Sequence, residues 1–204
     1  MPGLNNPPTI QIEVDLYLHV RVLIAIILGL SVTRLLGGLA QFMRQSDHHL
    51  FSWIHLTWVA WVFFNVIAFW WWEFRLSQIT HWTFALYLFV IAYASMFFLQ
   101  AALLFPNDIE GYESYGDYFI ARRTLFFGIF ALTEAMDVVD TLIKGTEHLR
   151  SLGPEYLVRN AVFLALCLVA ARTRNLTFHR LFAGGALVYE VIYISRQYFT
   201  LLRP

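Results

Sequence analysis

The chain has 204 residues, of which 59% are hydrophobic and only 14% are charged, and its mean hydropathy is +0.59. Soluble domains usually carry about 25% charged residues, so this composition argues against a soluble protein and for an integral membrane protein. Fourteen basic residues balance fourteen acidic ones, which gives no support for nucleic acid or another polyanionic partner.

Six apolar segments have the length that crosses the hydrocarbon layer of a bilayer, which takes about 20 residues of helix. In chain order they cover residues 17–42, 50–74, 80–105, 124–144, 155–172 and 177–202. Backbone groups in lipid must find their hydrogen bonds within the segment, so all six are predicted to be helices. The sequence therefore predicts an all-α, polytopic membrane protein that forms one six-helix transmembrane domain over residues 1–204.

The connections between the predicted spans are short, except for residues 106–123. An even number of spans places both termini on the same side of the membrane. The connections after the first, third and fifth spans carry six arginines, whereas the termini and the other connections carry four basic residues. The positive-inside rule then places the termini outside the cytoplasm, with the chain in the cytoplasmic (inner) membrane.

Three carboxylates lie within the fourth predicted span, at Glu134, Asp137 and Asp140. An acid near the bilayer centre costs about 2.5–3.5 kcal/mol on insertion scales, so it usually faces protein or water and often marks a functional site. Each helical residue turns by about 100°, which places these acids within about 120° of arc together with Thr133, Thr141 and Lys144. The opposite face is apolar, which predicts a polar stripe directed into the bundle.

The sixth predicted span repeats this pattern. One face of it holds Tyr189, Glu190, Tyr193, Arg196, Gln197 and Thr200, again within about 120° of arc. Glu134 and Glu190 are predicted near mid-bilayer, with Asp137, Asp140 and Arg196 in the outer half. The sequence thus predicts a polar pocket that opens outward between the first, fourth, fifth and sixth spans, with Asn160, Tyr189 and Tyr193 as neutral ligand contacts.

Four arginines within the spans match the four acids in number: Arg21, Arg34, Arg159 and Arg196. Arginine pairs with carboxylates through two hydrogen bonds, so one interpretation is a structural charge network that holds the helices in register. The other interpretation is a pocket for a small ion or solute, in which the acids bind a cation or exchange protons and the arginines act as countercharges. Glu134 and Glu190 are the better proton carriers because they lie deepest.

Three functions follow from these interpretations. The first is binding or conduction of a small ion or solute, as in a transporter, where the small size of the chain favours a homo-oligomer. The second is a non-enzymatic scaffold subunit of a larger membrane complex. The third is an intramembrane enzyme or a haem protein, for which His55 with His179, or His19 with His81, lie at matching predicted depths. No cofactor or metal is expected, because no metal-ligand spacing or nucleophile motif occurs, and an enzyme is the less favoured function.

Overall fold

The computed structural model describes residues 8–44, 51–79, 81–106, 109 and 111–201, with side chains from residue 16 to residue 196. It contains six α-helices and one short 3-10 helix, η2, and within these residues there is no strand. The bounds are α1 Pro8–Arg44, α2 Trp53–Trp72, η2 Glu73–Gln78, α3 Phe84–Leu104, α4 Tyr115–Ile143, α5 Thr146–Arg172 and α6 Leu176–Leu201. The prediction of an all-α chain is confirmed.

Side-chain caps define where several helices begin. The hydroxyl oxygens of Ser52, Thr83 and Ser114 accept hydrogen bonds from backbone N–H groups three residues later and so start α2, α3 and α4. The cap at Ser114 explains a difference from the sequence prediction, because α4 begins nine residues before residue 124 and shortens the predicted connection 106–123. Likewise, α5 begins at Thr146 rather than at residue 155, with a kink at Gly153 (φ +72°) followed by Pro154.

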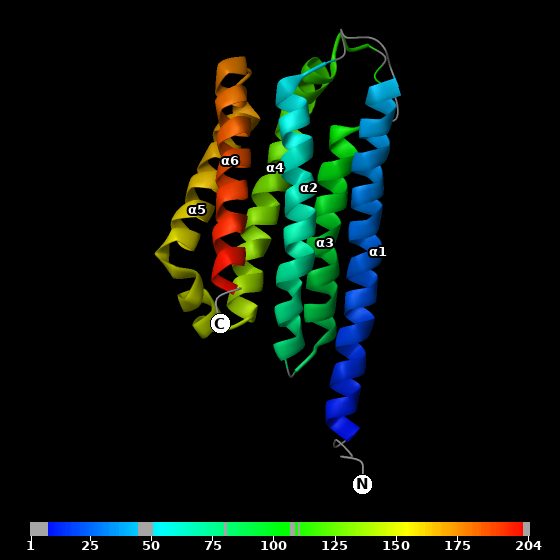
Figure 1. Cartoon of the computed structure of the whole chain (residues 1–204), viewed down its shortest axis with the longest axis vertical. Coiled ribbons are helices and arrows are strands. Elements are labelled where there is room, and N and C mark those ends of the chain that lie inside the picture. The colour runs from blue at the N-terminus through cyan, green and yellow to red at the C-terminus, as the bar shows by residue number, and fades with distance from the viewer. Residues whose placement is uncertain (1–7, 45–50, 80, 107–108, 110, 202–204) are drawn as a thin grey trace.

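The helices run alternately up and down the long axis of an elongated bundle, and both ends of the chain lie at the same end of it (Figure 1). Helix α2 contacts α1, α3, α4 and α6, whereas α5 packs chiefly against α4. This arrangement brings α2 and α3 against the acidic helix α4. The predicted pocket between the first, fourth, fifth and sixth spans is therefore incomplete, because it omitted these two helices.

Among the described residues, four helical segments are long and apolar enough to cross a membrane: 16–44, 53–78, 84–104 and 146–172. Helices α4 and α6 are not among them, so the predicted number of six spans is not confirmed. Large apolar side chains cover the outer faces of the bundle, for example Val22, Val158 and Leu181, which are 60%, 61% and 72% exposed. The interior is rich in buried aromatic rings, with Trp58 at its centre. A soluble chain rarely exposes so many large apolar groups together, so these faces favour contact with lipid.

A single glycine allows α1 to lie close to the end of α3. A Cβ atom on Gly38 would lie 2.1 Å from Cγ of Phe105, whose buried ring packs edge-on against the stacked rings of His55 and Tyr115. The neighbouring Gly37 would meet nothing within 4 Å.

We therefore expect Gly38→Ala to destabilise the protein by about 1–3 kcal/mol, because the packed ring cannot move aside. Gly37→Ala is the matched control and should be neutral or stabilising by up to about 1 kcal/mol, since alanine favours helix. Thermal unfolding of the detergent-purified variants measures both effects. Equal melting temperatures for the two variants would contradict the close contact between α1 and Phe105.

Candidate functional site

A partly open cavity of about 610 Å³ lies in the half of the bundle that contains η2 and the end of α4. All six α-helices contribute to its wall. The polar stripe predicted on the fourth span forms one side, since Thr133, Glu134, Asp137, Asp140, Thr141 and Lys144 all line it. Five acids face this space: Glu73, Glu134, Asp137, Asp140 and Glu190.

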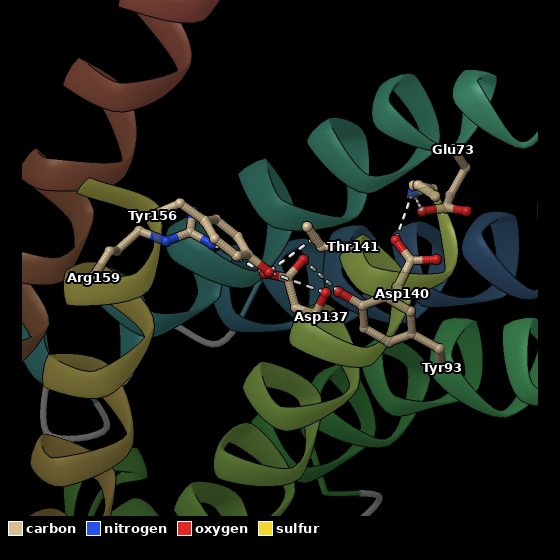
Figure 2. Close-up of polar contacts among 8 residues, drawn as sticks. Glu73, Tyr93, Asp137, Asp140, Thr141, Tyr156 and Arg159 are labelled. Carbon is tan, nitrogen blue, oxygen red and sulfur yellow. Dashed lines mark hydrogen bonds and ion pairs between the residues drawn. The ribbon is translucent and has the colours of Figure 1, made fainter. Parts of the chain in front are cut away.

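Asp137 is the most completely bonded of these acids (Figure 2). Its carboxylate accepts hydrogen bonds from the hydroxyls of Tyr93 (3.1 Å) and Tyr156 (2.8 Å) and pairs with the Arg159 guanidinium at 3.2 Å. Because the Tyr156 proton is donated to Asp137, the Thr141 hydroxyl must donate to Tyr156, with 2.9 Å between the two oxygens. Asp137 therefore joins α3, α4 and α5 and contributes to their packing.

Lys144 forms a second centre at the end of α4. Its Nζ lies 2.8 Å from Glu73 Oε1 and 2.5 Å from Asp140 Oδ2, and all three side chains are 4–6% exposed. The triad ties the junction of α2 and η2 to the end of α4, and Figure 2 shows the two acids facing each other there. Sequence reasoning did not include Glu73 among the acids of the spans and did not treat Lys144 as a countercharge, although both lie inside predicted spans.

Glu134 and Glu190 differ from the other three acids, because no hydrogen bond or ion pair to either carboxylate is found among the described side chains. Glu190 is only 3% exposed and its Oε1 atom is buried without a partner, as is Oε2 of Glu134. The two acids interact electrostatically with each other and with Arg159. Since Arg159 already pairs with Asp137, one guanidinium serves three carboxyl groups in this part of the cavity.

The other predicted site residues divide into two groups. Tyr193 and Arg21 line the cavity; the Arg21 guanidinium carbon lies 5.2 Å and 5.5 Å from the ring centroids of Trp70 and Phe74. Asn160, Arg34 and Arg196 do not line it. Asn160 is buried and donates to the Tyr156 carbonyl, Arg34 donates to the Phe105 carbonyl, and Arg196 pairs with the exposed Glu155.

The expected matching of four arginines with the four acids is thus replaced by a different set of pairs. Arg159 pairs with Asp137, whereas Lys144 serves Asp140 together with Glu73. The side chains of Gln197 and Thr200, predicted on the polar face of the sixth span, lie outside the described part of the chain.

The histidines considered for haem are not part of the cavity wall. His55 Nε2 lies 2.6 Å from the Leu104 carbonyl oxygen, and His179 Nε2 lies 3.0 Å from that of Thr173, so each ring is held by backbone. His19 and His81 also lie outside the cavity wall. Over the described residues, no group of three or more His, Cys, Asp and Glu side chains is arranged to hold a metal ion.

Comparison with known proteins gives no assignment: no protein-family model matches the chain, and no curated protein or solved structure is significantly similar to it. Functional inference therefore depends on the cavity itself.

Proposed function

We propose that the protein is an integral membrane protein of the cytoplasmic membrane whose six helices span the bilayer and bind a small ion or solute in the cavity. The observation that carries this proposal is the pair Glu134 and Glu190, two acids in a cavity with no countercharge of their own. Burying a charge without a partner is costly, so a site that retains such groups favours a ligand or a proton that neutralises them. The termini would face away from the cytoplasm.

The other half of the bundle supports a closed, substrate-binding state over an open pore. Beyond the cavity, Trp58 packs against Phe126, Phe127, Phe130 and Phe182 at ring-centroid distances of 5.2–5.6 Å. These rings are buried and fill the interior of the described part of the bundle beyond the cavity. Transport would require a second arrangement of the helices, and a homo-oligomer would give this small chain a larger frame against which to move.

The second candidate is a scaffold subunit of a larger membrane complex. The observation that favours it is the network of hydrogen bonds and ion pairs around Asp137 and Lys144, which joins α3, α4, α5 and η2. Purification in mild detergent separates the two candidates, because a scaffold should arrive with a stoichiometric partner subunit. A scaffold role, however, does not explain why Glu134 and Glu190 have no ion-pair partner among the described residues.

The proposal predicts that the cavity is wet and that the outer faces are in lipid. We expect Asn65→Cys, in the cavity wall, to react with a water-soluble methanethiosulfonate reagent in native membranes, in a Cys167→Ala background. The matched control is Ile67→Cys, two residues along α2, where the side chain is 46% exposed in the isolated chain. In lipid that thiol should stay unreacted, because the reactive thiolate does not form there.

Mass spectrometry of the labelled protein gives the ratio of the two rates. We expect Asn65→Cys to react at least tenfold faster than Ile67→Cys. A water-soluble protein would give the reverse order, and a dry charge network would leave both cysteines unlabelled; either result would overturn the proposed function.

A further inference from the structure

We infer that the ligand of the cavity is a small organic cation, an amine or a quaternary ammonium compound, that binds with its charge between Glu134 and Glu190. This inference rests on the proposed function and adds the chemical class of the ligand. It starts from Glu190, whose side chain lines the cavity, is 3% exposed and has a buried oxygen with no partner.

The charge around the two acids fixes the sign of the ligand. The charged groups that act on both of them are Arg159 and Asp137, which form an ion pair of 3.2 Å, so a single guanidinium serves three carboxyl groups here. At the other end of the cavity, Lys144 is neutralised by Glu73 and Asp140. Glu134 and Glu190 thus share Arg159 with Asp137 and have no cation of their own among the described side chains, and a cation bound between them would favour their ionised form.

The aromatic wall indicates that this cation is organic. Trp61, Phe69, Phe97, Phe163 and Tyr193 all line the cavity. The wall already holds one cation by its rings, since the Arg159 guanidinium carbon lies 4.9 Å from the Tyr193 centroid and 5.4 Å from that of Tyr156. Aromatic faces attract organic cations through their quadrupoles, and cages of such rings are the usual way in which proteins recognise quaternary ammonium groups.

The size of the cavity supports the same class. Its volume of about 610 Å³ falls within the range of about 300–1,000 Å³ typical of sites for small organic ligands. A bare metal ion would leave most of that space unfilled. Within the described residues there is also no cluster of three or more His, Cys, Asp and Glu side chains to coordinate one.

The test compares choline with 3,3-dimethylbutan-1-ol, a neutral molecule of nearly the same shape in which carbon replaces the charged nitrogen. Binding to the detergent-purified protein is measured by isothermal titration calorimetry, together with a series from methylammonium to tetraethylammonium. We expect at least one cation of the series to bind, and choline to bind at least tenfold more tightly than its neutral analogue. Glu190→Gln and Glu134→Gln should each weaken cation binding at least tenfold.

Glu155→Gln is the matched control, because Glu155 is an exposed acid outside the cavity that pairs with Arg196. Glu155→Gln should leave cation binding unchanged. Only variants whose melting temperature equals that of the unmodified protein are compared. If Glu190→Gln fails this check, Glu190→Asp, which keeps the charge, replaces it and should retain part of the affinity. Equal binding of choline and the neutral analogue would overturn the organic cation while leaving the proposed solute site intact. If no cation of the series binds, the inference of an organic cation is also wrong. The proposed function would be wrong as well only if Asn65→Cys also stayed unlabelled.

Discussion

Replacing Lys144 by methionine should cost about 3–5 kcal/mol of folding free energy, among the largest effects expected from any single substitution in this chain. Lys144 is the only lysine in the sequence, and its ammonium group lies between two carboxylates that are themselves 4–6% exposed. Methionine fills a similar volume but leaves Glu73 and Asp140 facing each other without a cation. The loss should appear as a lower melting temperature and as unfolding at a lower fraction of denaturing detergent.

Two controls separate the lost charge from the lost packing. Arg150→Met removes an exposed basic side chain near the same end of the bundle and should change stability by no more than about 0.5 kcal/mol. The triple variant Glu73→Gln, Asp140→Asn, Lys144→Met removes all three charges and should recover most of the stability, because no buried charge is left unpaired. If Lys144→Met melted at the same temperature as Arg150→Met, the buried triad would be wrong.

The second large effect is expected at Trp58, at the centre of the aromatic interior. Its ring is fully buried and contacts Phe126, Phe127 and Phe130 of α4 and Phe182 of α6, so it joins three helices. Trp58→Ala should cost about 3–5 kcal/mol, since the surrounding rings cannot close the space that it leaves. Helix association in lipid depends on such packing, because lipid chains supply no hydrophobic driving force of their own.

Trp53→Ala is the matched control, because Trp53 lies on the same helix but is 74% exposed. We expect it to change the melting temperature little, and Trp58→Phe to fall between the two. Similar melting temperatures for Trp58→Ala and Trp53→Ala would mean that the interior is not packed around this ring.

Hydropathy and helical periodicity predicted much of this molecule. The helices α2 and α3 begin and end within six residues of the predicted spans, because their apolar runs are long and uninterrupted. The stripe on α4 follows from the helical repeat alone, and all six of its residues lie in the cavity wall. The start of α4 was missed because the cap at Ser114 extends the helix through residues with no strong apolar signal.

The partners of the polar residues could not be predicted in the same way. Periodicity gives the face on which Asp137 lies, but its bonds to Tyr93 and Tyr156 depend on which helices are neighbours. Equal numbers of acids and arginines in the spans suggested that they pair with one another. In the structure, Asp140 pairs with Lys144. Arg34 instead donates to the Phe105 carbonyl, and Arg196 pairs with Glu155. Glu73 was overlooked because it follows three tryptophans at the end of an apolar run and resembles a residue of the membrane surface.

The most direct test of a charged cavity within the bilayer is the depth of α4, the helix that carries three of the five acids. Leu125, Leu132 and Val139 lie seven residues apart on its outer face and are 51%, 50% and 45% exposed. Single spin labels at these positions, in proteoliposomes and in a Cys167→Ala background, report accessibility to oxygen and to a water-soluble nickel chelate. The first and last positions lie about 21 Å apart along the helix, which places Leu132 between them at the middle of the span.

The ratio of oxygen to nickel accessibility should be highest at Leu132 and fall toward Leu125 and Val139. That profile would place Glu134, two residues from Leu132, at mid-bilayer depth. Uniformly high nickel accessibility at all three positions would contradict it, because α4 would then face water and its acids would not lie inside a membrane.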